Sequence, residues 1–165
     1  MKTLVLCLGN DILTDDAAGL LAARELRKRV GDSAEVRESS ESGFALLDLM
    51  TGFERMLIID SIRTGAYPPG TILEFHAEDL GEVAAPSPHY AGLPELIALA
   101  RRLDLLFPTE IAILALEVKD PFTIGEGLTR DVESALEALV ERAMGKLRYW
   151  LEESTPSPPT HPAPP

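Results

Sequence analysis

Three short, uninterrupted apolar runs dominate the pattern of hydrophobic and polar positions along this chain. They occupy residues 4–8, 56–59 and 111–116. Each run is too short for a stable helix and lacks the alternation of a strand with one exposed face. Each is therefore predicted to be a strand buried on both faces, as parallel strands are in α/β proteins.

Four other segments carry apolar residues at helical spacing. Gly31 is expected to end the first of these helices. Thr129 is predicted to cap the last helix, and Leu136 is expected at the centre of that helix's apolar stripe. The predicted helices cover approximately residues 16–30, 44–50, 92–103 and 129–150. Strands thus alternate with helices, which predicts an α/β fold.

Two weaker strands complete the pattern. Residues 34–38 alternate weakly and are predicted to form an outer strand. The segment from Thr71 to Phe75 also resembles a strand, but only ten residues separate it from Asp60. A helical crossover to a parallel strand needs about a dozen residues or more, so this strand is expected to run antiparallel. Its mixed polarity predicts a position at or near an edge of the sheet.

The chain is predicted to form one domain followed by a tail. Its 165 residues are enough to bury a substantial core, and residues 1–153 show no internal repeat or composition break. Six of the last twelve residues, 154–165, are proline. This tail is predicted to be disordered and dispensable for folding.

Charge and cysteine content restrict the class of partner. The 27 acidic and 15 basic residues give a net charge of −12, which argues against a nucleic-acid or anionic-membrane partner. The single cysteine, Cys7, lies inside an apolar run and is predicted to be a core residue; it fits a reducing compartment. No apolar run approaches the ~20 residues of a membrane span, and no signal peptide is recognisable. The chain is predicted to be cytoplasmic and without membrane insertion.

Polar residues stand where the predicted buried strands end. Gly9-Asn10, Asp60 and Glu117 follow the three runs. Asp16 lies in the opening turn of the first helix, and His89 precedes the third. Since the carboxyl ends of parallel strands meet at the edge where α/β proteins bind ligands, these side chains are expected to lie close together. Two carboxylates and an imidazole suit either a borderline divalent metal or acid–base chemistry.

Each of these side chains also has a purely structural explanation. Asp15 and Asp16 are favourable at a helix start because of the helix dipole, and Asp60 can cap a turn. His89 follows Pro88 in a polar loop, where a lone histidine is usually solvated. His76 and His161 have no acidic strand end beside them in the sequence and are expected at the surface. Whether Glu117 has a functional or a structural role is ambiguous from the sequence. The role of Glu38, at the end of a weak strand, is more ambiguous still.

Three familiar motifs are absent from the sequence. Gly9 is followed neither by the remaining glycines of a dinucleotide fingerprint nor by the Gly-Lys-Ser/Thr of a P-loop. The Gly-x-Ser-x-Gly element of α/β serine hydrolases does not occur. The sequence therefore predicts no organic cofactor and no serine nucleophile of that type.

Four motifs, in this order and spacing, resemble those of the hydrogenase maturation endopeptidases. These proteases remove a C-terminal extension from the large subunit of [NiFe]-hydrogenases. The resemblance covers approximately residues 1–149. The motifs are Gly9-Asn10 with Thr14-Asp15-Asp16 and Gly19, Ile58-Ile59-Asp60-Ser61 followed by Pro69-Gly70-Thr71, Ser87-Pro88-His89 with Gly92-Leu93, and Gly127-Leu128-Thr129.

The resemblance implies a fold and a site. The fold would be a three-layer α/β/α sandwich around a mixed, mostly parallel five-stranded sheet. The family's metal-contacting positions fall on Asp16, Asp60 and His89, which would contact nickel already carried by the hydrogenase precursor. Asp16 and Asp60 would also be the catalytic carboxylates of an aspartic-type or substrate-metal-assisted endopeptidase. The loops around Gly9, Asn10 and Gly43 would shape the cleft.

One segment departs from the family pattern. The family usually has an acidic residue followed by a Gly-Gly-Thr type turn, where this chain has Glu38, three serines, Glu41 and Gly43. A catalytic role for Glu38 is accordingly the weakest assignment. The alternative function is a non-catalytic nickel-binding chaperone or adaptor of hydrogenase assembly that uses the same three ligands.

Overall fold

A mixed five-stranded sheet forms the centre of the computed structural model, which describes residues 1–81, 89 and 92–154. The strand order is β2-β1-β3-β5-β4, and only β4 runs antiparallel, against β5. The strands are β1 (Thr3–Leu8), β2 (Glu35–Ser39), β3 (Arg55–Ile62), β4 (Ile72–His76) and β5 (Glu110–Glu117). The predicted antiparallel strand and the predicted outer strand thus form the two edges, as expected.

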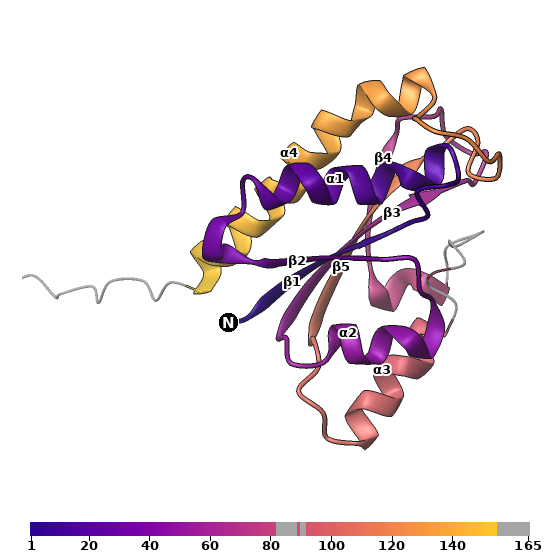
Figure 1. The fold of residues 1–165 in the computed structure, drawn as a ribbon. Coiled ribbons are helices and arrows are strands. Elements are labelled where there is room, and N and C mark those ends of the chain that lie inside the picture. The colour runs from indigo at the N-terminus through magenta and orange to yellow at the C-terminus, as the bar shows by residue number, and fades with distance from the viewer. Residues whose placement is uncertain (82–88, 90–91, 155–165) are drawn as a thin grey trace, which may run out of the picture.

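Helices cover both faces of this sheet and make three layers. Figure 1 shows α1 and α4 on one face and α2 and α3 on the other. The α-helices are α1 (Ala18–Arg27), α2 (Leu47–Met50), α3 (Leu93–Arg102) and α4 (Arg130–Ser154). Short 3-10 segments are η1 (Asp15–Ala17), η2 (Gly31–Ser33), η3 (Gly43–Leu46) and η4 (Ala77–Gly81). None of the helices within these described ranges combines the length and apolar character that a bilayer span requires.

The ends of the first and last helices differ from the sequence prediction. A 3-10 turn carries Asp16, so α1 begins only at Ala18, and it ends at Arg27. In contrast, α4 continues past Trp150 to Ser154. Thr129 does not cap α4 with its hydroxyl, which instead donates a hydrogen bond to Asp15. Helix ends depend on such contacts with other segments, which hydrophobic periodicity does not contain.

The uniform apolar runs are explained by burial on both faces of the sheet. In β1, Val5 and Cys7 join the core beneath α1 and α4, whereas Leu4, Leu6 and Leu8 join the core beneath α2 and α3. The same alternation holds in β3 and β5. Cys7 is fully buried, as predicted, and this burial raises the pKa of its thiol, so the side chain is a neutral core group.

Two glycines allow the segment between β1 and α1 to lie against the carboxyl ends of the strands. A Cβ on Gly19 would stand 2.1 Å from the carbonyl oxygen of Leu8 and 3.1 Å from that of Ile59. A Cβ on Gly9 would stand 2.2 Å from the carbonyl oxygen of Asp16. The contacts at 2.1 and 2.2 Å are too short for a real Cβ, so only glycine permits this close packing.

The end of β3 lies beyond the residue at which the sequence predicted it. The strand continues past Asp60 to Ile62, because β5 pairs with it as far as Ile62 and Glu117. Pairing with β1 ends earlier, at Cys7 and Ile59. Asp60 therefore lies at the point where β1 and β3 diverge. After β1, the next strand, β2, pairs on one side of β1, and the following strand, β3, pairs on its other side. The gap between the carboxyl ends of β1 and β3 is therefore the topological switch point of the sheet, where α/β proteins bind ligands.

The buried stripe of α4 is not centred on Leu136. That side chain is only partly buried against the core. The fully or almost fully buried residues of α4 are Val132, Leu139, Val140, Ala143, Leu147 and Trp150. Periodicity specifies the direction in which a helical side chain points, but not how completely neighbouring elements cover it.

We expect Leu139→Ala to lower the free energy of unfolding by about 2–5 kcal/mol, because it removes a fully buried side chain and leaves a cavity. Leu136→Ala is the matched control on the same helix, and its partial exposure predicts a clearly smaller loss. Urea denaturation followed by circular dichroism measures both. Equal losses would contradict the burial difference between the two positions.

Candidate active site

Ser61 connects the two predicted acidic residues. Its hydroxyl donates a hydrogen bond to Oδ1 of Asp16 (2.7 Å), and its backbone N–H donates to Oδ1 of Asp60 (2.8 Å). Asp60 is completely buried, and Asp16 is partly buried. In the sequence, Ser61 is recognisable only as part of a motif. Its hydroxyl orients a carboxylate 45 residues away, which no local pattern indicates.

His89 completes the arrangement. Its Nδ1 lies 3.1 Å from Oδ2 of Asp60, and its side chain is only 13% exposed. The structure therefore brings Asp16, Asp60 and His89 together at the switch point, linked as Asp16–Ser61–Asp60–His89. His89 is mostly buried and hydrogen-bonded to a carboxylate, so it is not the solvated loop histidine that the purely structural explanation of the sequence predicts.

The donor atoms of this site suit a divalent metal ion. His89 Nδ1 and Asp60 Oδ2 are 3.1 Å apart, close to the spacing of about 3 Å between two ligands at a right angle with metal bonds of about 2.1 Å. Among the described residues, however, no three histidine, cysteine or acidic side chains already form a metal-holding group. An ion contacted by both His89 and Asp60 would replace the hydrogen bond between them.

The buried charges shift two pKa values. Burial raises the pKa of Asp16 by penalising its charged form, and the charge of Asp60 adds to this rise, whereas the hydrogen bond from Ser61 opposes it. Burial lowers the pKa of His89, but the hydrogen bond and charge of Asp60, with the charge of Asp16, outweigh it, so the pKa is raised. The imidazole thus holds its proton to a higher pH than a free histidine does.

We expect the His89 ring to titrate above pH 6.5 in the metal-free protein, and Asp60→Asn to lower its pKa, because the variant removes the charge of Asp60 and leaves the effect of burial. NMR titration of the imidazole resonances measures both values. Because the pKa of His89 is higher in the folded than in the unfolded protein, the protonated ring adds to the free energy of unfolding. This contribution is complete below about pH 6.5 and is lost as the pH rises through the pKa of the folded state. An unchanged pKa in the variant would contradict the Asp60–His89 contact.

Glu117 and Glu38 do not join this site. Glu117 is buried and accepts hydrogen bonds from the backbone N–H groups of Thr64 and Gly65 and from the Thr64 hydroxyl, so it organises the segment after β3. Glu38 forms an ion pair with Arg27. Both carboxylates thus have partners of their own outside the Asp16–Ser61–Asp60–His89 arrangement.

The residues expected to shape the cleft have separate positions. Gly9, Asn10 and Glu38 are among the residues that line a cavity of about 380 Å³ at the carboxyl ends of β1 and β2. Gly43 opens η3 with a φ of 57°. A Cβ added to Gly92 would lie 4.0 Å from the Cα of Gly43. Gly43 therefore borders the start of α3, and Gly92 follows His89 by three residues.

Asp15 is a residue whose importance the sequence did not reveal. It is completely buried, and its carboxylate accepts four hydrogen bonds, which come from the backbone N–H groups of Lys119, Asp120 and Thr129 and from the Thr129 hydroxyl. It thereby ties the segment that carries Asp16 to the segment between β5 and α4. Its donors lie more than a hundred residues away, so only the tertiary structure shows this role.

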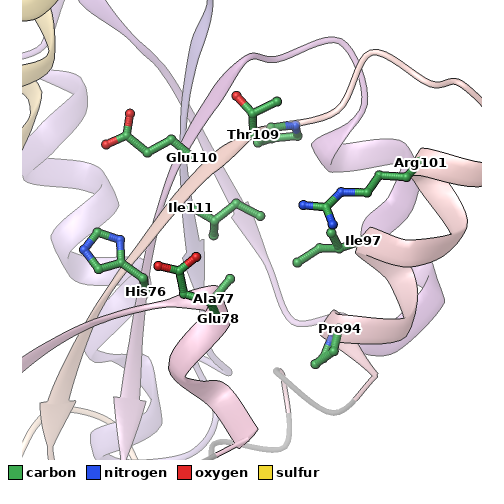
Figure 2. A pocket seen from close by; sticks show the side chains of 10 residues that line it. His76, Ala77, Glu78, Pro94, Ile97, Arg101, Thr109, Glu110 and Ile111 are labelled. Atoms are coloured by element: carbon green, nitrogen blue, oxygen red, sulfur yellow. The ribbon is translucent and has the colours of Figure 1, made fainter.

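A second cavity lies at the other end of the sheet. It has a volume of about 680 Å³, and Figure 2 shows side chains of α3 on one side and of β5 and η4 on the other. Its lining includes Glu110, which pairs with Arg55 at the amino ends of β5 and β3, so it is distant from Asp60. His76 also lines it and is partly buried, contrary to the predicted surface position. His161 lies outside the described residues.

The fold and this site together define an α/β protein with two carboxylates and a histidine at the switch point of its sheet. The sequence model of the hydrogenase maturation protease family matches residues 21–146, a range that includes Asp60 and His89 and begins after Asp16. The chain belongs to this family, as its motifs predicted, and is therefore a protease.

Known relatives agree over nearly the full length. The Hydrogenase 2 maturation protease of Escherichia coli K12 is 28% identical over 98% of this chain and 99% of its own. The structure of the E. coli hydrogenase maturating endopeptidase HybD matches with a TM-score of 0.78 and 28% identity, over 91% of this chain and 94% of that one. The [NiFe] hydrogenase maturation protease HybD of Thermococcus kodakarensis matches with a TM-score of 0.72 and 31% identity, over 89% and 99% of the two chains.

Proposed function

We propose that this protein removes the C-terminal extension from the large-subunit precursor of a [NiFe]-hydrogenase, and does so only after nickel has been inserted. The observation that carries the proposal is the Asp16–Ser61–Asp60–His89 arrangement at the switch point of a hydrogenase maturation protease. The relatives named as hydrogenase maturation proteases support the choice of substrate.

Nickel enters this proposal as part of the substrate. Two carboxylates and an imidazole, with no thiolate among them, make a comparatively weak site for a free ion. Such a site suits an ion that the precursor already holds, because the protease then needs only to complete the coordination. The buried negative charge of Asp60 attracts a cationic centre, and its low exposure limits screening by salt. A precursor without nickel would lack this attraction.

The carboxylates supply the acid–base chemistry. Asp16 is the favoured base, because burial raises its pKa and makes it a better proton acceptor than an ordinary aspartate. It would take a proton from a water molecule whose oxygen attacks the scissile carbonyl carbon, and would pass that proton to the amide nitrogen as the C–N bond breaks and the C-terminal peptide leaves as an amine. Asp60 is held between the Ser61 N–H and His89, and this fixes the orientation of the imidazole. Nickel in the substrate would polarise the same carbonyl in a substrate-metal-assisted variant of the reaction.

The test mixes the purified protein with its matched precursor, prepared with and without nickel, and follows release of the C-terminal peptide by mass spectrometry. Cleavage of the nickel-loaded precursor alone is the expected result. Equal cleavage of both forms would refute recognition of nickel. Binding of the nickel-loaded form without any cleavage would instead support the chaperone or adaptor function.

A further inference from the structure

Three large apolar side chains project from the loops beside the site. Ile12 is 58% exposed, Phe122 is 69% exposed and Ile124 is 79% exposed. Ile12 belongs to the segment between β1 and α1, and the other two belong to the segment between β5 and α4. We call these three residues the apolar patch. Large exposed apolar side chains that gather on a folded protein are typical of interaction sites.

The two loops that carry the apolar patch are paired rigidly. Leu13 and Ile124 form an antiparallel bridge, and the backbone N–H of Gly125 donates a hydrogen bond to the carbonyl of Ile12 (3.1 Å). The Thr14 N–H and hydroxyl both donate to the carbonyl of Thr123. The buried Asp15 adds its contacts to the same pairing. Loops fixed in this way hold their apolar side chains outward in the folded state.

The apolar patch lies on or beside the segments that carry Asp16 and Asp60. Ile12 precedes Asp16 by four residues, and both lie on the loop that the bridge holds in place. The guanidinium of Arg63, three residues after Asp60, lies 5.6 Å from the centre of the Phe122 ring. Figure 1 shows both loops at the same end of the sheet. Phe44 and Tyr67, also exposed, follow the carboxyl ends of β2 and β3.

We propose that the apolar patch is the surface on which the folded body of the hydrogenase large-subunit precursor docks, through an apolar area next to its nickel-bearing segment. This inference rests on the proposed function and adds the surface that selects the substrate. A centre that is acidic and buried, bordered by apolar side chains, complements a cationic metal centre with apolar surroundings. Docking there brings the metal to Asp16 because one rigid loop carries both Ile12 and Asp16.

The precursor fits this surface better than a second copy of the chain does. A symmetric dimer through the apolar patch would put the acidic ends of two chains together, and each chain carries a net charge of −12. It would also cover the site that a protein substrate must reach. The shared segment of Ile12 and Asp16 and the repulsion between copies therefore both favour the substrate.

The experiment measures binding and cleavage separately. The variant Ile12→Ser/Phe122→Ser/Ile124→Ser is compared with wild type, using purified nickel-loaded precursor in calorimetry and in the mass-spectrometric cleavage assay. Leu103→Ser/Leu106→Ser is the matched control, since these residues are 55% and 60% exposed on the turn between α3 and β5, at the opposite end of the sheet. Thermal melts verify folding, and Ile124→Ser alone replaces the triple variant if that variant unfolds.

We expect the triple variant to bind the precursor at least about tenfold more weakly and to show a raised KM with an unchanged kcat, while the control matches wild type. Unchanged binding by the triple variant, with normal wild-type cleavage, would overturn the docking surface and leave the proposed function intact. Wild-type binding without cleavage, lost in the triple variant, would support the surface and refute the protease reaction. Equal loss in the control, or a wild-type dimer that the triple variant abolishes, would overturn the docking proposal.

Discussion

Asp60→Asn is expected to reduce the rate of precursor cleavage by at least about 100-fold, the loss that a misplaced group in an active site causes. The substitution keeps the size of the side chain and an oxygen that can accept the Ser61 N–H. It removes the negative charge that holds His89 and would contact nickel. The loss should therefore appear in catalysis and metal recognition, and little in the fold.

The cleavage assay with nickel-loaded precursor measures this effect. Glu41→Gln is the control, because it removes one negative charge from an exposed position near the same end of the sheet. We expect its rate to stay within a few-fold of wild type. A variant at Asp60 that cleaves at the wild-type rate would exclude this carboxylate from the reaction, and a variant that unfolds would show that its role is structural.

Asp15→Ala is expected to lower the free energy of unfolding by about 3–4 kcal/mol, although the neighbouring Asp16 belongs to the proposed active site. The substitution leaves four donors without their acceptor in a fully buried position, and each unsatisfied buried donor costs about 1–3 kcal/mol before water or rearrangement compensates it. Asp15→Asn should cost less, because it retains one oxygen acceptor.

Urea and thermal denaturation measure these losses. Asp32→Ala serves as the comparison, since Asp32 is exposed and its loss should change stability by no more than about 0.5 kcal/mol. Similar effects at Asp15 and Asp32 would mean that the hydrogen bonds of Asp15 do not hold the two loops together.

Much of the fold followed from local pattern. The three apolar runs predicted the three central strands, because a strand covered by helices on both faces must present apolar residues in both directions. The short connection before Thr71 predicted the antiparallel edge strand, since ten residues cannot hold a helical crossover. The end of the second apolar run also indicated that Asp60 would lie near the first loop, although β3 itself continues to Ile62.

The tertiary structure decided which acidic residues come together at the switch point. Asp15 and Asp16 are adjacent, yet one is bound by the segment after β5 and the other by Ser61. Glu117 also follows a buried strand, but Thr64 and Gly65 occupy its carboxylate. A sequence pattern predicts the element on which a side chain lies and the face that it takes. Its partners come from segments up to 114 residues away, and only the packing of the whole chain brings them within hydrogen-bonding distance.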